Sequence, residues 1–303
     1  MKKIKVILNP YANRWRAGSR VDEVRTAFAS VDTAVSLHPE IIQTEKPGEA
    51  IDLAETAVAE GCDAVVAAGG DGTLSEVANG LLRAAGTGKT VPFGILPIGT
   101  ANDFSDMVGL PRDLKAAAQI IAAGKTSQID AGRVNDHFFI NNCAVAMEPM
   151  ITLENIRMKR LSGELRYVVA LVRGLVRLKA WNMQVRWDDG GHDGPAYLLS
   201  VCNGPRTGGF YMAPNAAVDD GLFDFVFAPE VPKLTVLAIL AKLFRKTHID
   251  HPQVVYGRTR HIHITSSPGT PIHADGEIIA EAATQIEYQI LPGKLTLLTA
   301  TGK

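Results

Sequence analysis

A glycine-rich junction between an apolar strand and a helix constrains this chain more than any other feature. Residues 64–68 have the short apolar character of a buried strand, Gly69-Gly70-Asp71-Gly72-Thr73 follows, and a helix is expected from near Leu74. Consecutive glycines let the backbone approach a phosphate closely, and the amides at a helix start favour an anion. Asp71 would repel that anion unless a divalent cation lies between them, as in metal-assisted phosphoryl transfer. Taken alone, the junction also fits a turn that only lets helix and strand pack closely.

Short apolar strands alternate with helices over residues 1–127. The expected strands are Lys5–Leu8, Asp63–Ala68 and Val91–Leu96, and the expected helices are Val21–Ser30, Gly48–Glu60, Leu74–Ala85 and Leu114–Ala123. Such alternation indicates parallel βαβ units with both sheet faces covered. Ligands bind these sheets at the carboxyl ends of the strands. Three strand ends carry turn residues and should share one edge: Asn9-Pro10, Gly69–Thr73 and Pro97–Asp103.

Residues 128–303 follow a different pattern, mostly of antiparallel strands. Two apolar runs flank Asn135-Asp136, which reads as a hairpin. The expected strands are Gln128–Val134, His137–Val145, Met183–Trp187, Ala196–Cys202, Leu222–Ala228, Arg260–Thr265, Gln285–Leu291 and Lys294–Thr299, with a polar turn at Asp188–Gly194. Helical insertions are expected near Ile151–Lys179 and Leu234–Lys246. We therefore predict an α/β domain over 1–127 and a β-rich domain, a sandwich or open barrel, over 128–303.

Composition fits a globular enzyme and not a binder of polyanions. The 303 residues are 46% hydrophobic and the formal net charge is -1. Cys62, Cys143 and Cys202 stand singly within apolar runs, which favours buried thiols in a reducing compartment over a disulfide framework. No apolar stretch approaches the roughly 20 residues that span a bilayer, and the first residues lack a signal-peptide core. We expect a cytoplasmic protein that does not bind nucleic acid.

Three motifs in a fixed order carry a family resemblance: GGDGTLSEV at 69–77, PIGTANDF at 97–104 and DGE at 275–277. Together they resemble the diacylglycerol kinase catalytic-domain family, and in particular its small soluble bacterial lipid kinases. Further matching stretches are Asn203–Pro214, Ala216–Asp224 and His251–Arg258. The resemblance covers nearly the whole chain. It implies a nucleotide-binding α/β domain, a β-rich domain, an active site in the cleft between them, and phosphoryl transfer from ATP to a lipid hydroxyl.

The resemblance assigns the nucleotide and Mg²⁺ to the loops of the predicted sheet edge. Asp71 would act through Mg²⁺, while Gly70, Gly72 and Thr73 would offer amide or hydroxyl donors. Thr100 matches a nucleotide contact and Asn102 would approach the phosphates or the adenine, although turn formation and helix capping also account for this segment. The full implied set is Asn9, Pro10, Asn13, Arg14, Thr44, Gly69, Gly70, Asp71, Gly72, Thr73, Glu76, Thr100 and Asn102.

Four of these assignments have an alternative in ordinary structural chemistry. Asn13 stands where most family members have glycine, and Asn is the residue after glycine that best adopts a positive φ. Arg14 would contact phosphate or be a solvated arginine. Thr44 would contact the nucleotide or simply enter a helix. Glu76, one turn into its helix, would act as a capping carboxylate or contact the nucleotide.

The late DGE motif supplies the implied catalytic residues. Alone, Asp275-Gly276-Glu277 reads as a hairpin turn. With the resemblance, Glu277 becomes the general base that accepts the lipid hydroxyl proton. Asp275 becomes a partner carboxylate of Asp71 that helps to hold Mg²⁺ or water. Two carboxylates and a polyphosphate cannot share a site without cations, which supports a metal requirement.

Two further acidic positions carry weaker implications. Asp219-Asp220-Gly221 fits a tight turn, and the resemblance implies an accessory metal held by Asp220 with the backbone carbonyls of Ala217 and Leu222. Asp130 either faces the cleft or caps a domain junction.

Diacylglycerol is the first acceptor that the resemblance implies, met at a membrane surface; a homodimer is left open. Residues 157–179 hold seven basic residues against one acidic residue, with apolar residues at helical spacing. This pattern fits an ordinary surface helix or an anionic membrane interface, which Leu234–Lys246 could assist. The rival activities are NAD kinase, which shares GGDGT but lacks the other motifs, and a sphingoid or ceramide kinase. A catalytically silent sensor of nucleotide or lipid also stays open, because Asn13 and Cys143–Met147 depart from the family pattern.

Overall fold

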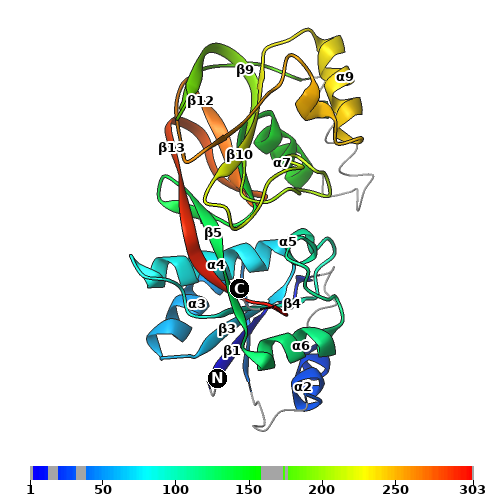
Figure 1. Cartoon of the computed structure of the whole chain (residues 1–303), viewed down its shortest axis with the longest axis vertical. Helices are drawn as coiled ribbons and strands as arrows, with labels where there is room; N and C mark the ends of the chain where they lie inside the picture. The colour runs from blue at the N-terminus through cyan, green and yellow to red at the C-terminus, as the bar shows by residue number, and fades with distance from the viewer. Residues whose placement is uncertain (1–2, 13–19, 32–38, 158–172, 175–176, 302–303) are drawn as a thin grey trace. The chain divides into compact units, whose positions relative to one another are not determined.

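The computed structural model describes residues 3–12, 20–31, 39–157, 173–174 and 177–301. It divides into two compact units, which are described separately below (Figure 1). Unit 1 comprises Met1–Ala131 together with Leu291–Lys303, and unit 2 comprises Gly132–Ile290. The two-domain architecture with a β-rich second domain is confirmed, but the division differs from the predicted 1–127 and 128–303 because the C-terminal residues return to unit 1.

Unit 1 is built on a parallel sheet with helices on both faces. Its strands run in the order β2 (Glu40–Gln43), β1 (Ile4–Leu8), β3 (Ala64–Gly69) and β4 (Phe93–Pro97), and the last part of β13 pairs with β4. Every residue of β1, β3 and β4 is buried, as expected for strands covered on both sides. The sequence analysis missed β2, whose residues are only half-buried or exposed.

In the described part of unit 1, helices cover both faces of the sheet. Helices α2 (Val21–Ala29) and α6 (Leu114–Ala123) share one apolar cluster with alternate residues of β1 and β3, whereas α3 (Glu49–Ala59) and α4 (Asp71–Ala85) lie on the other face (Figure 1). A short helix, α5 (Asp103–Met107), follows β4.

Helix α4 begins three residues earlier than predicted. Gly70 is its extended N-cap, and the amide of Leu74 donates the first helical hydrogen bond to the carbonyl of Gly70 at 3.0 Å. Asp71-Gly72-Thr73 is therefore the first helical turn and not a loop. The prediction was wrong because the apolar periodicity starts only at Leu74, whereas an acidic residue is itself favourable in a first turn.

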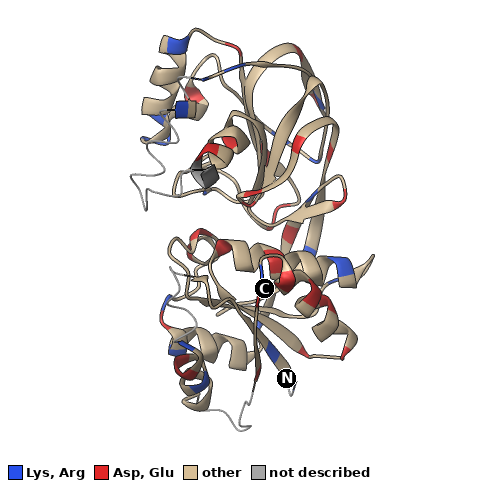
Figure 2. Cartoon of the chain, turned by 180° about the vertical axis from the view of Figure 1, so that it is seen from behind, with Lys and Arg blue, Asp and Glu red and all other residues tan. Residues whose placement is uncertain are grey.

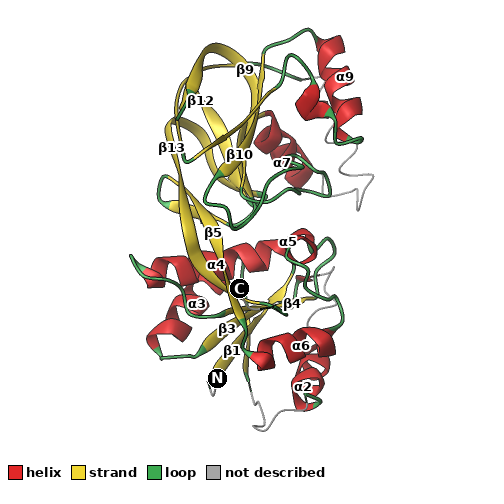
Figure 3. Ribbon diagram, viewed as in Figure 1, coloured by secondary structure: helices red, strands yellow, loops and turns green. Residues whose placement is uncertain are grey.

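Unit 2 is an antiparallel, sandwich-like β structure (Figure 3). Its strands run β11–β10–β9–β7–β12–β13, and β8 pairs with both β9 and β12. The bounds are β6 His137–Phe139, β7 Asn142–Ala146, β8 Trp181–Trp187, β9 Gly190–Cys202, β10 Phe223–Pro229, β11 Val255–Thr259, β12 His261–Ala274 and β13 Glu277–Leu298. The core between the layers is rich in aromatic side chains, among them Phe139, Phe223, Phe225 and Tyr288. The helices of unit 2 include α7 (Met147–Arg157), α9 (Lys233–Leu243) and the 3-10 turn His248–Asp250.

Several predicted strand boundaries were wrong in unit 2. The expected polar turn at 188–194 is only Asp188-Asp189, because β9 already begins at Gly190. The two expected strands at 285–291 and 294–299 are one strand, β13. Pro292-Gly293 does not end it, because Gly293 at φ 55 donates its amide to Asp130 Oδ1 of β5 (Thr126–Val134) at 2.7 Å.

The predicted strand His137–Val145 is two strands, β6 and β7, because the amides of Ile140 and Asn141 donate to Asp275 between them. The predicted strand Arg260–Thr265 is the first part of the longer β12, and β11 was not predicted.

The Asn135-Asp136 hairpin is present, with β5 and β6 antiparallel around it. The three cysteines are free and buried. Most of the predicted basic helix over 157–179 lies outside the described residues. Within the described ranges, no helix combines the length and apolar character needed to cross a bilayer.

Close packing of α3 on α4 depends on Gly80. A Cβ at this position would lie 2.3 Å from the carbonyl oxygen of Ile51 and 2.8 Å from Ala54 Cβ. We therefore expect Gly80→Ala to lower the free energy of unfolding by about 1–3 kcal/mol, although alanine has the higher helix propensity. Urea denaturation followed by circular dichroism measures this. Gly88→Ala is the matched control, since its Cβ would meet only Ala85 O at 3.4 Å; equal losses in both variants would contradict the packing argument.

Candidate active site

The carboxyl ends of the parallel strands meet along one edge of unit 1. The amide of Asn9, after β1, donates to Ala68 O of β3 at 3.0 Å. The amide of Thr44, after β2, donates to Leu8 O of β1 at 2.9 Å, and that of Gly99, after β4, donates to Gly69 O at 3.0 Å. The three turn-rich segments of the sequence analysis are thus brought together, and Thr44 joins them.

Two glycines permit the closest approach between these segments. A Cβ on Gly99 would lie 2.3 Å from Gly70 Cα, and one on Gly70 would lie 3.2 Å from Gly99 Cα. The backbones after β3 and β4 therefore touch directly. Any side chain at position 99 would push the PIGTAN segment away from the start of α4.

Thr73 is fixed by a neighbouring strand end. Its side chain is buried and packs against Gly69. A Cβ at position 69 would lie only 2.4 Å from Thr73 Oγ1, so glycine is needed there. Asn9 Nδ2 donates to Thr73 Oγ1 at 3.0 Å, and Asn9 Oδ1 accepts from the amide of Tyr11 at 2.8 Å. Because Thr73 Oγ1 is the acceptor, its own hydroxyl hydrogen can still be donated to a ligand.

The N-terminus of α4 suits an anion. Its N-cap is Gly70, which has no side chain that could accept hydrogen bonds from the first-turn amides. The amides of the first turn carry the positive end of a 15-residue helix. An anionic oxygen at this end would satisfy those amides.

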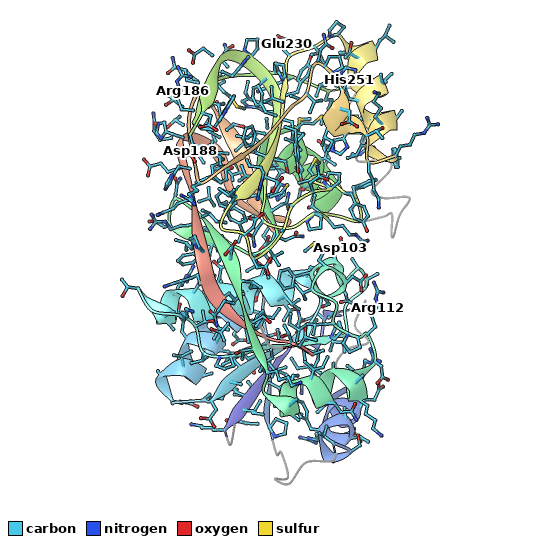
Figure 4. All side chains as sticks on the ribbon, viewed as in Figure 1. Asp103, Arg112, Arg186, Asp188, Glu230 and His251 are labelled. Carbon is cyan, nitrogen blue, oxygen red and sulfur yellow. The ribbon has the colours of Figure 1, made fainter. Side chains whose placement is uncertain are left out.

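At the start of α4, the surroundings of Asp71 disfavour the charged form of its carboxyl group. Burial raises its pKa, and the neighbouring Asp103 raises it further, against a hydrogen bond from the Phe104 amide to Asp71 Oδ1 at 3.0 Å. Asp103 and Arg112 lie at the α5 end of unit 1 (Figure 4). Arg112 is committed to Asp106, at 2.7 and 3.0 Å, and to Ala101 O. The sequence analysis did not identify Arg112.

This carboxylate environment fits a divalent cation. A half-buried carboxylate beside another acidic side chain is stabilised by added positive charge, and oxygen ligands suit Mg²⁺. Within the described residues no cluster of three or more His, Cys, Asp or Glu side chains forms a complete metal site. A metal at Asp71 would therefore need ligands from phosphate or water as well as from the protein.

Asn102 has a structural role that the sequence left open. It is buried, adopts φ 54, and closes its own loop. Its Oδ1 accepts from the Gly99 amide at 3.1 Å and its Nδ2 donates to Gly99 O at 3.2 Å. It occupies the N-cap position of α5 without a side-chain capping bond. Thr100, by contrast, is exposed on the same loop.

Glu76 caps a helix, but not its own. It accepts hydrogen bonds from the amides of Gly48 at 3.0 Å and Ala50 at 3.3 Å, at the start of α3. Burial raises its pKa, and the two amides partly offset this. Of the two alternatives that the sequence left open, these contacts support capping. Asn13 and Arg14 lie outside the described residues.

In unit 2, Asp275 and Glu277 form the two sides of one tight turn. Asp275 (φ 47) and Gly276 (φ 88) give a hairpin that joins β12 to β13. Both carboxylate oxygens of Asp275 point into the backbone: they accept from the amides of Ile140, Asn141 and Asn142 at 2.9, 2.9 and 3.0 Å. Glu277, two residues later, is exposed. The geometry gives Asp275 a supporting role in the turn, where the sequence predicted a metal partner.

A buried polar group behind this turn was missed by the sequence analysis. Glu148 of α7 accepts from Asn142 Nδ2 at 2.9 Å and lies 3.2 Å from His273 Nε2. Burial opposes ionisation of Glu148, but His273 and Asn142 outweigh it, so its pKa lies below the usual value. His273 Nδ1 accepts from the Gly276 amide at 3.3 Å. No spacing in the sequence links these residues, because they come from three separate elements.

The predicted accessory metal site is engaged by an arginine. Asp220 Oδ1 accepts from the Leu222 amide at 3.1 Å, and Asp220 Oδ2 forms an ion pair with Arg258. The tight turn is therefore present, with Gly221 at φ 74. A cation at Asp220 would have to coexist with the guanidinium or displace it.

A separate groove of about 460 Å³ lies on unit 2, lined by residues of β5, β8, β12 and β13 and of the turns after β5 and β8; they include Arg186, Asp188 and Glu287. Figure 4 labels two of them. None of the predicted site residues lines it.

Comparison with known proteins identifies the family. Residues 3–134 match the diacylglycerol kinase catalytic domain, and residues 146–299 match the YegS C-terminal NAD kinase beta sandwich-like domain. A diacylglycerol kinase of Staphylococcus epidermidis is 32% identical over 237 residues, which cover 77% of this chain and 74% of that one. The chain belongs to the diacylglycerol kinase family.

Other relatives extend the match along the chain. A diacylglycerol kinase of Staphylococcus aureus is 28% identical over 278 residues, covering 91% of this chain and 86% of its own. A solved structure assigned as a diacylglycerol kinase from Bacillus anthracis superposes with a TM-score of 0.79 at 21% identity, over 98% and 94% of the two chains. Yeast NADH kinase shares the fold more distantly, with a TM-score of 0.51 at 12% identity over 99% and 84%.

The raised pKa of Asp71 predicts how stability depends on pH. Because the folded state holds this proton more tightly than the unfolded chain, the free energy of unfolding falls as pH rises through the folded pKa. Asp71→Asn keeps an acceptor for the Phe104 amide and removes the charge. We therefore expect the difference in free energy of unfolding, Asp71→Asn minus native protein, to increase by on the order of 1 kcal/mol as the pH is raised from 4 to 8.

Urea denaturation at each pH measures this difference. Asp52→Asn, at an exposed position of α3, is the control and should show no such change. A difference between Asp71→Asn and the native protein that stays constant with pH would show that burial does not penalise the Asp71 carboxylate.

The supporting role of Asp275 gives a second prediction. Asp275→Asn tolerates the positive φ but turns an amide group toward backbone N–H donors. We expect the free energy of unfolding to fall by about 1–3 kcal/mol. Glu277→Gln, in the same turn but exposed, should stay within about 0.5 kcal/mol of the native protein. Unchanged stability of Asp275→Asn together with lost Mg²⁺ dependence would favour the metal-partner role instead.

Proposed function

We propose that this chain is an ATP-dependent lipid kinase that phosphorylates diacylglycerol to phosphatidic acid. The observation that carries the proposal is the start of α4, where helix amides could bind an anion beside a half-buried carboxylate, Asp71. Phosphate and a divalent cation together would satisfy both groups. Family membership supports the kinase chemistry, and the names of the relatives support diacylglycerol as the acceptor.

Unit 1 supplies the nucleotide contacts in this proposal. The first-turn amides of α4 and the Thr73 hydroxyl donate to the polyphosphate, and Asn9 holds Thr73 in place. The exposed Thr100 contacts the nucleotide, whereas Asn102 shapes the loop that presents it. Thr44 and Pro10 flank the same edge, and Asn13 and Arg14 follow it in sequence. When bound, Mg²⁺ at Asp71 supplies charge neutralisation for the phosphates.

Unit 2 supplies acceptor activation. The Glu277 carboxylate takes the proton of the lipid hydroxyl as the hydroxyl oxygen attacks the γ-phosphorus. The bond from the γ-phosphorus to the β–γ bridging oxygen breaks, and ADP leaves with that electron pair. Asp275 positions Glu277 indirectly: it accepts hydrogen bonds from three backbone amides, and these hold the turn in which Glu277 lies. We also propose an accessory metal held by Asp220 and the carbonyls of Ala217 and Leu222. Its binding would require the Arg258 guanidinium to move away from Asp220.

A transfer assay with labelled ATP and Mg²⁺ tests the proposal. Diacylglycerol, sphingosine, ceramide and NAD are offered separately, and we expect label in phosphatidic acid. Asp71→Asn and Glu277→Gln should each lower the rate by about 100-fold or more. Asp52→Asn and Glu281→Gln are matched controls at exposed positions and should retain the native rate.

Each other outcome has a distinct meaning. Label in sphingosine or ceramide alone would keep the lipid kinase and change its acceptor. Label in NAD alone would overturn the lipid assignment in favour of the more distant NADH kinase likeness. ATP binding without transfer to any acceptor would support a nucleotide or lipid sensor.

A further inference from the structure

Helix α9 is apolar on both of its faces. Its inner residues pack on unit 2: Val236 lies in a cluster with Tyr197 and Val231, and Ile239 and Leu243 pack against a second cluster around Val226. A surface helix normally turns polar side chains outward. The outer face of α9 does not.

The outward face forms a continuous apolar stripe. Leu234 is 81% exposed, Leu237 is 52% exposed and Phe244, at the C-cap, is 65% exposed. Ala238 and Ala241 are also exposed and fall between them at helical spacing. These three are most of the large hydrophobic side chains exposed in the described part of the chain; the others, Tyr11 and Val255, lie elsewhere. An exposed patch of this kind marks an interaction surface.

Basic residues predominate along this apolar stripe, and the nearest acidic residues in sequence, Glu230 and Asp250, lie just outside it. Residues 231–249 contain Lys233, Lys242, Arg245 and Lys246 and no acidic residue. Figure 2 shows basic residues at both ends of α9. The surface that α9 offers is therefore a row of apolar side chains bordered by cations.

Aromatic side chains extend the stripe at the end of α9. The Phe244 ring meets Phe210 edge-on, with 5.4 Å between centroids. Lys246 Nζ lies 3.4 Å from the centre of the Tyr211 ring, and Arg206 stacks near the same ring at 5.4 Å. Aromatic rings beside cations are typical of the interface between lipid headgroups and acyl chains.

We infer that α9 docks on an anionic bilayer surface, with Leu234, Leu237 and Phe244 entering the headgroup–acyl boundary and the neighbouring Lys and Arg side chains contacting anionic headgroups. An amphipathic surface of this kind binds through buried apolar area together with attraction to anionic lipids. A second copy of the chain fits the same face poorly, because a symmetric α9 contact would bring eight like charges together. The inference rests on the proposed function in one respect: a lipid kinase must reach its acceptor in a bilayer.

Vesicle flotation tests the docking directly and without any activity measurement. The full chain is mixed with phosphatidylcholine vesicles or with vesicles that also contain phosphatidylglycerol. We expect binding to the anionic vesicles, and a partition coefficient lowered about tenfold or more by Leu234→Ser with Leu237→Ser. Lys233→Gln with Arg245→Gln should weaken binding to anionic vesicles only, and added salt should weaken the native protein in the same way.

Val255→Ser is the matched control. Val255 is also an exposed apolar residue of unit 2, on β11, and its loss should leave vesicle binding unchanged. Because Leu234 and Leu237 are exposed, their replacement should also leave the unfolding transition unchanged, which circular dichroism verifies. Equal vesicle binding by the native protein and the Leu234, Leu237 variant would overturn the inference. Loss of a dimer in light scattering, without vesicle binding, would assign the face to a second copy instead.

Phosphorylation assays separate this inference from the proposed function. The Leu234, Leu237 variant should phosphorylate dispersed short-chain diacylglycerol at the native rate, but bilayer diacylglycerol at least several-fold more slowly. If the native protein phosphorylates no diacylglycerol yet binds anionic vesicles through α9, the proposed function fails and the docking stands. If it phosphorylates bilayer diacylglycerol and both α9 variants match it, the docking fails and the function stands.

Discussion

The direct backbone contact between Gly70 and Gly99 is the constraint on which the arrangement at the carboxyl ends of the unit 1 strands depends. The two segments follow neighbouring parallel strands, so their chain directions already bring them together. The absence of a side chain at Gly99 lets the second segment lie against the N-cap of α4. From that contact follow the closed loop around Asn102 and the hydrogen bond from the Phe104 amide to Asp71. The position of the Asp71 carboxylate therefore depends on the contact between Gly70 and Gly99.

The strand and helix pattern was largely readable because it depends on local periodicity. Fully buried strands such as β3 are recognisable from short runs of apolar residues. Amphipathic helices such as α6 (Leu114–Ala123) are recognisable from the helical spacing of their apolar residues. The failures came where tertiary contacts override local signals. The strand β13 continues through Pro292-Gly293 because Asp130 receives the Gly293 amide. The edge strand β2 is too polar and too short to be recognised.

The residue types of the candidate site could be found from sequence, but not their partners. Glu76 was identified as a carboxylate near a helix start, yet it caps α3, whose first residues lie 26 and 28 positions earlier. Asp275 was identified as acidic, yet its oxygens are directed at the amides of residues 140–142. A carboxylate that accepts several backbone amides and a carboxylate that binds a metal have the same sequence signature. Only the positions of the donors distinguish them.

Asp275 and Glu277 lie in the same three-residue turn but differ in their surroundings: the backbone binds one carboxylate, and the other is exposed. The fold satisfies Asp275 with backbone donors, and this fixes the positive-φ turn that follows it. Behind the turn, the Glu148–His273 pair holds the Gly276 amide from the other side. Glu277 is exposed at the start of β13, which is compatible with the role of proton acceptor proposed for it. Asp71 shows the converse arrangement: it is partly buried beside Asp103, and its raised pKa makes an added cation favourable. A fold optimised for stability alone would neutralise Asp71 as it does Asp275, so the remaining electrostatic cost at Asp71 is the physical argument for a functional role.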